Sequence, residues 1–465
     1  MEERKKGGSF SGSLGFILAA AGSAVGLGNI WRFPYLAAKG GGGVFLLCYV
    51  VLALTFGFAL LTTEIAIGRK TGKSPLTAYG ALHQNWKWIG PLACLVPTLI
   101  LPYYSVIGGW ILKYLTAFLT GHAGDTVEAG YFKSFTSDLS GPILWFVVYL
   151  VVTSAVVFMG VDKGIERLSK FLMPVLIVMI LGISIFSLTL SYTDETGVTR
   201  TGMQGFVVYA VPNFKGMTFQ RFAGILMDAM GQLFYSISVA MGIMITYGSY
   251  VKKDVNLVKS VNQIEIFDSA VAFLAGLMIV PAVYTFMGME GMGSGPSLMF
   301  VSLPRVFAEM GGLGKVAGVV FFLMVAFAAL TSSVSIMEAV VACVMDFFHM
   351  KRHNAVVCVA VVTFALGILV CLGYNVLFFN ITLPNGTAAQ ILDVMDYIAN
   401  YCLMPVIAVA TCILVGWVVG PDTVVKEVTL GGVSFGRQRL YVVMIRFVTP
   451  VMLVFLLMQS LGIIS

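Results

Sequence analysis

Long apolar runs recur along the whole chain and are separated by short polar stretches. A helix of about 20 apolar residues crosses the roughly 30 Å hydrocarbon core of a bilayer. The pattern therefore predicts an all-α integral membrane protein with eleven spans. Their expected positions are 14–38, 43–68, 89–118, 142–160, 164–190, 223–249, 259–289, 314–348, 355–374, 389–418 and 440–463.

The positions of Lys and Arg predict how the chain crosses the membrane. They concentrate in every second connecting segment, beginning with the N-terminal one, and cytoplasmic segments of multi-span proteins carry such an excess. We expect a multi-pass protein of the plasma (inner) membrane, with a cytoplasmic N-terminus and, after eleven spans, a C-terminus outside. The basic N-terminal segment 1–13 continues into the first apolar run without a clear cleavage site, so we expect it to be retained.

Composition supports the membrane assignment and excludes other classes of protein. Of 465 residues, 58% are hydrophobic and 11% are charged, against about 25% charged in a soluble domain. The net charge of +6 comes from basic residues scattered between spans, so we expect a lipid bilayer and no nucleic acid as a partner. The seven cysteines form no CxxC pair, which predicts small core residues and no disulfide. The histidines lie near segment ends and paired catalytic motifs are lacking, so no enzyme is expected.

Two spans contain a run of small and hydroxyl residues near their middle. The first span has residues 22–29 (GSAVGLGN), and the sixth has residues 236–242 (SISVAMG). Interruptions at matching positions of two halves indicate an inverted-repeat transporter with a binding site at the membrane midplane. Close packing of two unbroken helices would also need small residues, and this pattern alone does not separate the two explanations.

Those same residues resemble the signature of the neurotransmitter:sodium symporter family. Similar motifs recur in the family's order along nearly the whole chain. The matching blocks are 26–35 (GLGNIWRFPY) with 39–43 (KGGGG), 103–104 (YY), 231–236 (GQLFYS), 328–333 (AALTSS) and 392–396 (LDVMD).

The resemblance implies a five-plus-five inverted-repeat fold with broken helices 1 and 6 and one peripheral helix. We expect a cytoplasmic gate segment at 1–13, a first repeat at 14–190, an extracellular loop at 191–222, a second repeat at 223–418 and the peripheral span at 440–463. Many family members have twelve spans. Eleven spans make this chain similar to a bacterial subgroup that transports hydrophobic and aromatic amino acids.

The resemblance also implies two sodium sites made of oxygen ligands, which suit hard cations. For the first site we expect the Ala24 carbonyl with the side chains of Asn29, Ser236 and Asp268. For the second site we expect the carbonyls of Gly22, Val25 and Ala328 with the hydroxyls of Thr331 and Ser332, and none of these ligands is a carboxylate. Asp268 would supply the negative charge that chloride supplies in animal members, so chloride is not expected to be required. A structural aspartate bonded to the sixth helix is the alternative.

For the substrate, the resemblance implies that the amides of Leu27 and Gly28 and the Tyr104 hydroxyl hold a carboxylate. Monoamine carriers of the family have an aspartate at the position of Gly26, so glycine indicates a substrate that brings its own carboxylate. The side chains expected around the substrate carry no fixed charge: Ile100, Tyr104, Tyr235, Ser238, Met241, Ser332 and Ile336.

The last features that we expect are an extracellular gate, a cytoplasmic gate and a hinge. Arg32 and Asp396 resemble an extracellular ion pair above a lid of Tyr104 and Tyr235. On the cytoplasmic side, Asp346 resembles the partner of an N-terminal basic residue, which here is Arg4, Lys5 or Lys6. Gly164 and Pro174 could let the fifth span unwind, although a static proline kink fits equally well. Glu64 and Glu338 are expected to support the broken helices.

The function that follows is sodium-coupled symport of a neutral hydrophobic or aromatic amino acid by alternating access. A proton-coupled carrier or an exchanger is the alternative within the same class. A substrate sensor or uncoupled channel on the same fold is the alternative from another class.

Overall fold

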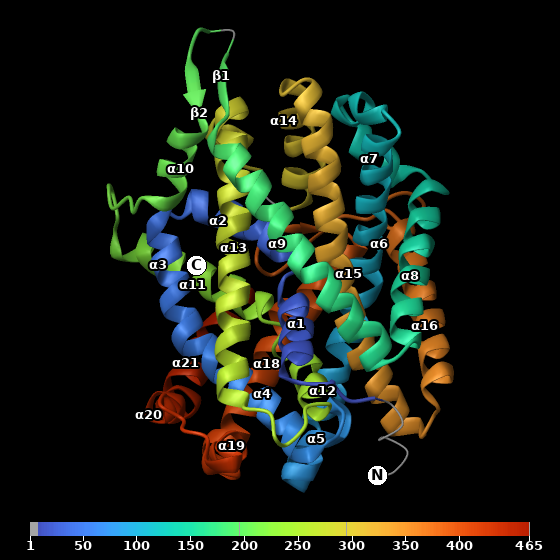
Figure 1. Cartoon of the computed structure of the whole chain (residues 1–465), viewed down its shortest axis with the longest axis vertical. Helices are drawn as coiled ribbons and strands as arrows, with labels where there is room; N and C mark the ends of the chain where they lie inside the picture. The colour runs from blue at the N-terminus through green and yellow to red at the C-terminus, as the bar shows by residue number, and fades with distance from the viewer. Residues whose placement is uncertain (1–7, 195, 294, 465) are drawn as a thin grey trace.

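The computed structural model describes residues 8–194, 196–293 and 295–464, and within these residues the fold is almost entirely helical (Figure 1). In the described part of the chain, nine helices are long and apolar enough to span a membrane, and a bent pair forms a tenth candidate. The nine are Gly43–Thr71 (α3 and α4), Gln84–Leu119 (with α6), Gly141–Phe158 (α8), Val161–Leu188 (with α9), Leu257–Met287 (α13), Gly312–Phe348 (α15), Arg352–Leu372 (α16), Ile391–Val418 (α17 and α18) and Gln438–Ser460 (α20 and α21).

Several of these spans contain short π-helical or 3-10 segments, so the α-helices within them are shorter than the spans themselves. The bounds are α3 Gly43–Leu52, α4 Phe58–Thr71, α6 Ile89–Leu119, α9 Arg167–Leu188, α17 Ile391–Asp396, α18 Met404–Ile413, α20 Gln438–Val443 and α21 Thr449–Ser460.

The first and sixth predicted spans are both interrupted. The bent pair consists of α1 (Ser13–Ala24) and the segment Gly28–Lys39, which ends in α2 (Phe33–Lys39), with 54° between them. In the sixth span, α11 (Phe219–Ser236) and α12 (Ile243–Ser249) are separated by residues 237–242. Both interruptions fall inside the small-residue runs. The all-helical fold with two broken helices is confirmed, whereas the count of eleven spans stays a prediction because α11 and α12 do not qualify as one span.

The connecting segments gather at two opposite ends of the molecule. The hairpin of β1 (Ser191–Thr193) and β2 (Thr199–Thr201) lies at the top of Figure 1 with α7 (Tyr131–Ser137), α10 (Gly202–Ala210) and α14 (Leu303–Glu309). At the bottom lie α5 (Pro75–Leu82), α19 (Asp422–Val428) and the start of the described chain. A second hairpin pairs β3 (Ile381–Thr382) with β4 (Ala388–Ala389). The named segments predicted to lie outside the cell are thus at the top, and those predicted to lie in the cytoplasm are at the bottom. The two hairpins differ from the sequence-based prediction, which is an all-α fold.

Close packing at the centre depends on small residues. At Gly109 in α6, an added Cβ would lie 2.6 Å from the Phe146 nitrogen in α8, which is closer than real atoms approach. Glycine therefore lets these two helices meet backbone to backbone, as is common in membrane proteins.

One cysteine pair corrects the sequence-based expectation. Cys94 in α6 and Cys343 in α15 are joined by a disulfide, with their Cα atoms 6.5 Å apart. They are separated by 249 residues in the sequence, so spacing motifs could not reveal the pair. The prediction of no disulfide was wrong because packing of α6 on α15 decides it.

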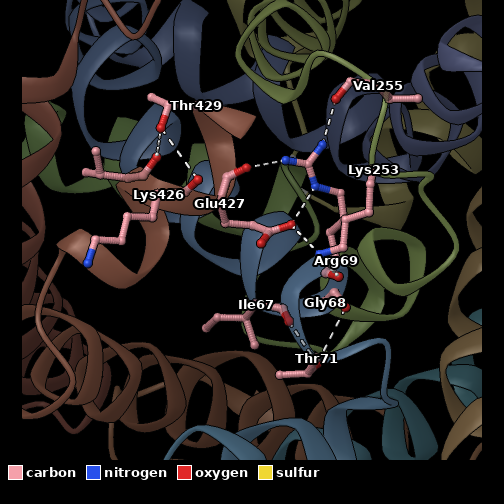
Figure 2. Close-up of polar contacts among 10 residues, drawn as sticks. Ile67, Gly68, Arg69, Thr71, Lys253, Val255, Lys426, Glu427 and Thr429 are labelled. Atoms are coloured by element: carbon pink, nitrogen blue, oxygen red, sulfur yellow. Dashed lines mark hydrogen bonds and ion pairs between the residues drawn. The ribbon is translucent and has the colours of Figure 1, made fainter. Parts of the chain in front are cut away.

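At the predicted cytoplasmic end, buried charges join three segments (Figure 2). Arg69 at the end of α4 donates from Nε to Oε1 of Glu427 in α19 at 2.8 Å and from Nη1 to the Val255 carbonyl at 2.6 Å. Lys253 donates from Nζ to the same Glu427 oxygen at 2.8 Å. Arg69 and Glu427 are only 3% and 5% exposed. We call these three side chains the Arg69–Glu427 cluster; it ties α19 to the end of α4 and to the loop after α12.

Replacing Glu427 should destabilise the protein because Arg69 would lose its counter-charge while staying buried. We expect Glu427→Gln to lower the free energy of unfolding by about 3 kcal/mol. The neighbouring Lys426 is exposed and its side chain points away from the cluster in Figure 2, so Lys426→Gln should change it by no more than about 0.5 kcal/mol. Thermal unfolding of both purified variants in one detergent checks this. Equal transition temperatures for Glu427→Gln and wild type would contradict it.

Candidate functional site

The break in the first span exposes backbone amides beside a tyrosine. The α-helix ends at Ala24, and a π-helical segment begins at Gly28. Between them, the Leu27 N–H faces the Tyr104 hydroxyl oxygen on α6 at 3.3 Å. Peptide groups at such a break lack helical partners, so they are open to ligands.

The break in the sixth span has an unusual backbone. Ser238 and Ala240 have φ values of 56° and 60°, a left-handed conformation that costs energy for any residue with a Cβ. Outside contacts hold it in place. The Ala240 N–H donates to Glu64 Oε1 at 2.6 Å, and the Ser238 hydroxyl donates to the Ser23 carbonyl of the first break at 3.1 Å.

A cavity of about 30 Å³ lies between the two breaks. No described residue that lines it carries a charged side chain. Its walls include every residue predicted to contact the substrate, and Ser23, which was missed although it lies in the first small-residue run. The lining residues are Ser23, Ala24, Gly26, Leu27, Gly28, Asn29, Ile100, Tyr104, Tyr235, Ser236, Ser238, Met241, Ser332 and Ile336.

Gly26 keeps this cavity open. An added Cβ would lie 3.1 Å from both the Tyr104 hydroxyl and the Ser332 hydroxyl, a tighter contact than most real Cβ atoms make. Any larger side chain would therefore occupy the space next to the Leu27 amide.

Asp268 in α13 lies fully buried against the first break. Its Oδ1 accepts from Asn29 Nδ2 at 3.0 Å and from the Ser236 hydroxyl at 2.7 Å, and its Oδ2 accepts from the Tyr49 hydroxyl at 3.2 Å. No described Lys or Arg forms an ion pair with it. Three of the four residues predicted for the first sodium thus touch one another, and the fourth, Ala24, lines the same cavity.

The five residues predicted for the second sodium also come together. The Ser332 hydroxyl lies 3.4 Å from the Gly22 carbonyl and 3.3 Å from the Val25 carbonyl, and the Thr331 hydroxyl donates to the Ala328 carbonyl at 3.0 Å. A hydroxyl carries one hydrogen, so it cannot satisfy several carbonyls at once. The carbonyl lone pairs that remain are suitable ligands for a small hard cation.

Tyr235 separates this cavity from a larger one of about 590 Å³ on the predicted extracellular side, and it lines both. Arg32 also lines the larger cavity and lies over the Tyr401 ring at 5.7 Å. Asp396 instead accepts from the Tyr103 hydroxyl at 2.8 Å and from Asn400. Within the described residues, the structure therefore does not bring Arg32 and Asp396 into direct contact.

At the opposite end, Asp346 caps the loop before α5. Its Oδ2 accepts from the Ser74 N–H at 2.9 Å and from the Thr77 hydroxyl at 3.1 Å. The basic residues expected to pair with it, at positions 4–6, lie outside the described residues. Phe10 is buried, and its ring centre lies 5.5 Å from that of Tyr247 in α12. The described part of the N-terminal segment is therefore packed, through Phe10, against the second half of the broken sixth span.

Glu338 has a partner that the sequence did not reveal. It forms an ion pair with Arg352 at the start of α16 and accepts from the Tyr250 hydroxyl at 2.7 Å. Tyr250 directly follows α12, so this contact joins α12 to α15. No sequence motif marks the Glu338–Arg352 ion pair, because it forms only when the turn between α15 and α16 brings the two residues together.

The residues proposed as a hinge lie in a continuous span. Gly164 is in the π-helical segment Val161–Glu166, and Pro174 is inside α9. An added Cβ at Gly164 would lie 2.1 Å from the Val156 carbonyl oxygen. Close packing against α8 thus gives a separate reason for glycine at this position, and unwinding stays a prediction.

Comparisons with known proteins identify the family of the chain. The model of the sodium:neurotransmitter symporter family matches residues 7–126 and 132–464. An uncharacterized sodium-dependent transporter of Bacillus subtilis, YhdH, is 33% identical, covering 98% of each chain. The rat sodium- and chloride-dependent GABA transporter 2 is 26% identical over 87% of this chain and 72% of its own.

The crystal structure of MhsT in complex with L-phenylalanine is similar to the whole fold. The TM-score is 0.83 at 33% identity, covering 97% of this chain and 99% of MhsT. The chain is a multi-span membrane protein and belongs to the sodium:neurotransmitter symporter family.

Proposed function

We propose that this sodium-dependent transporter carries a neutral hydrophobic or aromatic amino acid into the cell by sodium-coupled symport. The observation that carries the proposal is the uncharged cavity between the two breaks, which the Leu27 amide, the Tyr104 hydroxyl and Gly26 border on one side. The similar MhsT structure contains L-phenylalanine.

The polar side of the cavity suits a carboxylate. The Leu27 and Gly28 amides and the Tyr104 hydroxyl are donors, and Gly26 leaves the neighbouring space free. A substrate without a carboxylate would leave the Leu27 N–H with only its 3.3 Å hydrogen bond to the Tyr104 hydroxyl, a weaker partner than a carboxylate oxygen.

The remaining walls suit an apolar or aromatic side chain. Ile100, Met241 and Ile336 are buried and apolar, and Ser238 and Ser332 add hydroxyls. A charged substrate side chain would have no partner in this cavity, and burying it unpaired is strongly unfavourable. Met241 is flexible and can adapt to several substrate shapes.

Two sodium ions are the proposed co-substrates. The first would bind among Ala24, Asn29, Ser236 and Asp268, next to the carboxylate of the amino acid. The second would bind the carbonyl and hydroxyl oxygens around Ser332. When substrate and ion share ligands, each raises the affinity for the other by the same factor, and this reciprocity couples their transport.

Alternating access would use the two ends described above. On the outside, Tyr235 separates the cavities, and Arg32 and Asp396 approach when the gate closes. On the inside, the packed N-terminal segment and Asp346 would release, and the span containing Gly164 and Pro174 would open a path for sodium. A sensor or an uncoupled channel on the same fold would keep the cavity without this cycle.

Transport in liposomes tests the substrate class. With a sodium gradient directed inward, we expect phenylalanine or tryptophan to accumulate above the external concentration, because each carries the carboxylate that the cavity amides require. Tryptamine, which lacks the carboxylate, should neither be taken up nor compete for binding. A channel would equilibrate substrate without concentrating it, and a sensor would bind it without flux. Competition by tryptamine equal to that of tryptophan would contradict the substrate assignment.

The charge of Asp268 should matter for sodium and for chloride. We expect Asp268→Asn to weaken sodium binding at least about tenfold because it removes the negative charge from the first site. Wild-type transport should persist when gluconate replaces chloride, whereas the variant should gain activity when chloride is added. Sodium titration of substrate binding in both media measures this. Unchanged sodium affinity in the variant would assign Asp268 a purely structural role.

A further inference from the structure

Glu64 is a buried carboxyl group with no cationic partner among the described residues. It lies in α4, inside the predicted span Gly43–Thr71, and is 2% exposed. Its Oε1 accepts from the Ala240 N–H at 2.6 Å, while its Oε2 is buried without a hydrogen-bond partner in the described chain. One oxygen of the group thus stabilises the break of the sixth span, and the other is free.

The other buried glutamates show how this protein handles a buried charge. Each is paired with a Lys or Arg: Glu166 with Lys170, Glu265 with Arg437, Glu338 with Arg352, and Glu427 with Arg69 and Lys253 (Figure 2). Glu64 forms no ion pair with any described residue. An ionised carboxylate in this position would be an uncompensated charge in a low-dielectric environment, which is strongly unfavourable.

Among the described residues, no Lys or Arg is ion-paired with Glu64. Tyr79 on α5 and Cys412 on α18 are near enough to interact with it electrostatically, and the Tyr79 hydroxyl is paired with Thr411 at 3.1 Å.

On α13, which packs against α4, Glu265 is paired with Arg437, Asp268 is a further buried acid without an ion pair among the described residues, and Lys259 is exposed. On α19, Glu427 belongs to the Arg69–Glu427 cluster, whereas Asp422 and Lys426 are exposed. Arg446, in the segment Met444–Val448, donates from Nε to the Gly416 carbonyl. The described part of α12 contributes no charged residue.

We propose that Glu64 is a proton-binding site that is coupled to the break of the sixth span. In this conformation the group is a neutral acid: Oε2 carries the proton, and Oε1 accepts the Ala240 N–H. The proton comes from water and returns to water when movement of α12 or α5 hydrates the group. At low pH Glu64 stays protonated, and the conformation in which it accepts the Ala240 N–H is favoured. As the pH rises Glu64 loses its proton, and this conformation is no longer favoured.

Infrared difference spectroscopy of the full-length protein tests the proposal directly and does not depend on transport. At neutral pH, wild-type protein should show the carbonyl stretch of a buried protonated carboxylic acid. Glu64→Gln should abolish this band, whereas Glu265→Gln, which alters an ion-paired glutamate of similar burial, should leave it unchanged. A Glu64→Gln spectrum that retains the acid band would overturn the proposal.

Glu64→Gln also reproduces the shape and neutrality of the acid, so it should keep substrate affinity within about threefold of wild type. A loss of more than about tenfold in correctly folded protein would show that the ionised form is required, and the proposal would fail. If the variant does not fold, wild-type protein labelled with ¹³C at its glutamate carboxyl groups serves instead. The acid band should then shift with the label, and the absence of a shifted band would refute protonation of Glu64.

Discussion

The structure depends on one constraint: two helices stop inside a membrane, where a free peptide group has no water to bond to. Unsatisfied backbone groups in hydrocarbon are too costly to persist. Here the chain itself satisfies many of them. Glu64 accepts the Ala240 N–H, Gln232 donates to the Gly28 carbonyl at 3.1 Å, and Ser332 lies within reach of three carbonyls of the first break.

The groups that stay incompletely satisfied are the ones that face the cavity. The Leu27 amide has only the Tyr104 hydroxyl at 3.3 Å, and the carbonyls around Ser332 share one hydroxyl hydrogen. A carboxylate and small cations complement these donors and acceptors. The same physical defect that interrupts the helices therefore provides the site that the family uses for its ligands.

Buried carboxylates in the spans are likewise stabilised by hydrogen bonds or by ion pairs. Asp268 accepts three hydrogen bonds beside the cavity, and Glu338, Glu265 and Glu427 are each held by a basic side chain toward the ends of spans. These pairs connect helices to one another at the predicted cytoplasmic face. Glu64 differs because it accepts a hydrogen bond from the backbone of the sixth-span break and forms no ion pair with any described residue.

The spans and the two breaks could be predicted from the sequence because they depend on local composition. Apolar runs of sufficient length identify spans, and the small-residue runs at 22–29 and 236–242 mark where helices end. The motif resemblance then located residues such as Tyr104 and Met241, which do line the cavity.

Tertiary structure decided the contacts between residues far apart in the chain. The Cys94–Cys343 disulfide, the Arg352 partner of Glu338 and the separation of Arg32 from Asp396 all depend on which faces of packed helices meet. Hydrophobicity does not encode such pairings, because every apolar face is equally compatible with lipid and with another helix. The sequence by itself thus determined which segments enter the membrane and where they break. The packing of the helices determined which of these distant polar groups pair with one another.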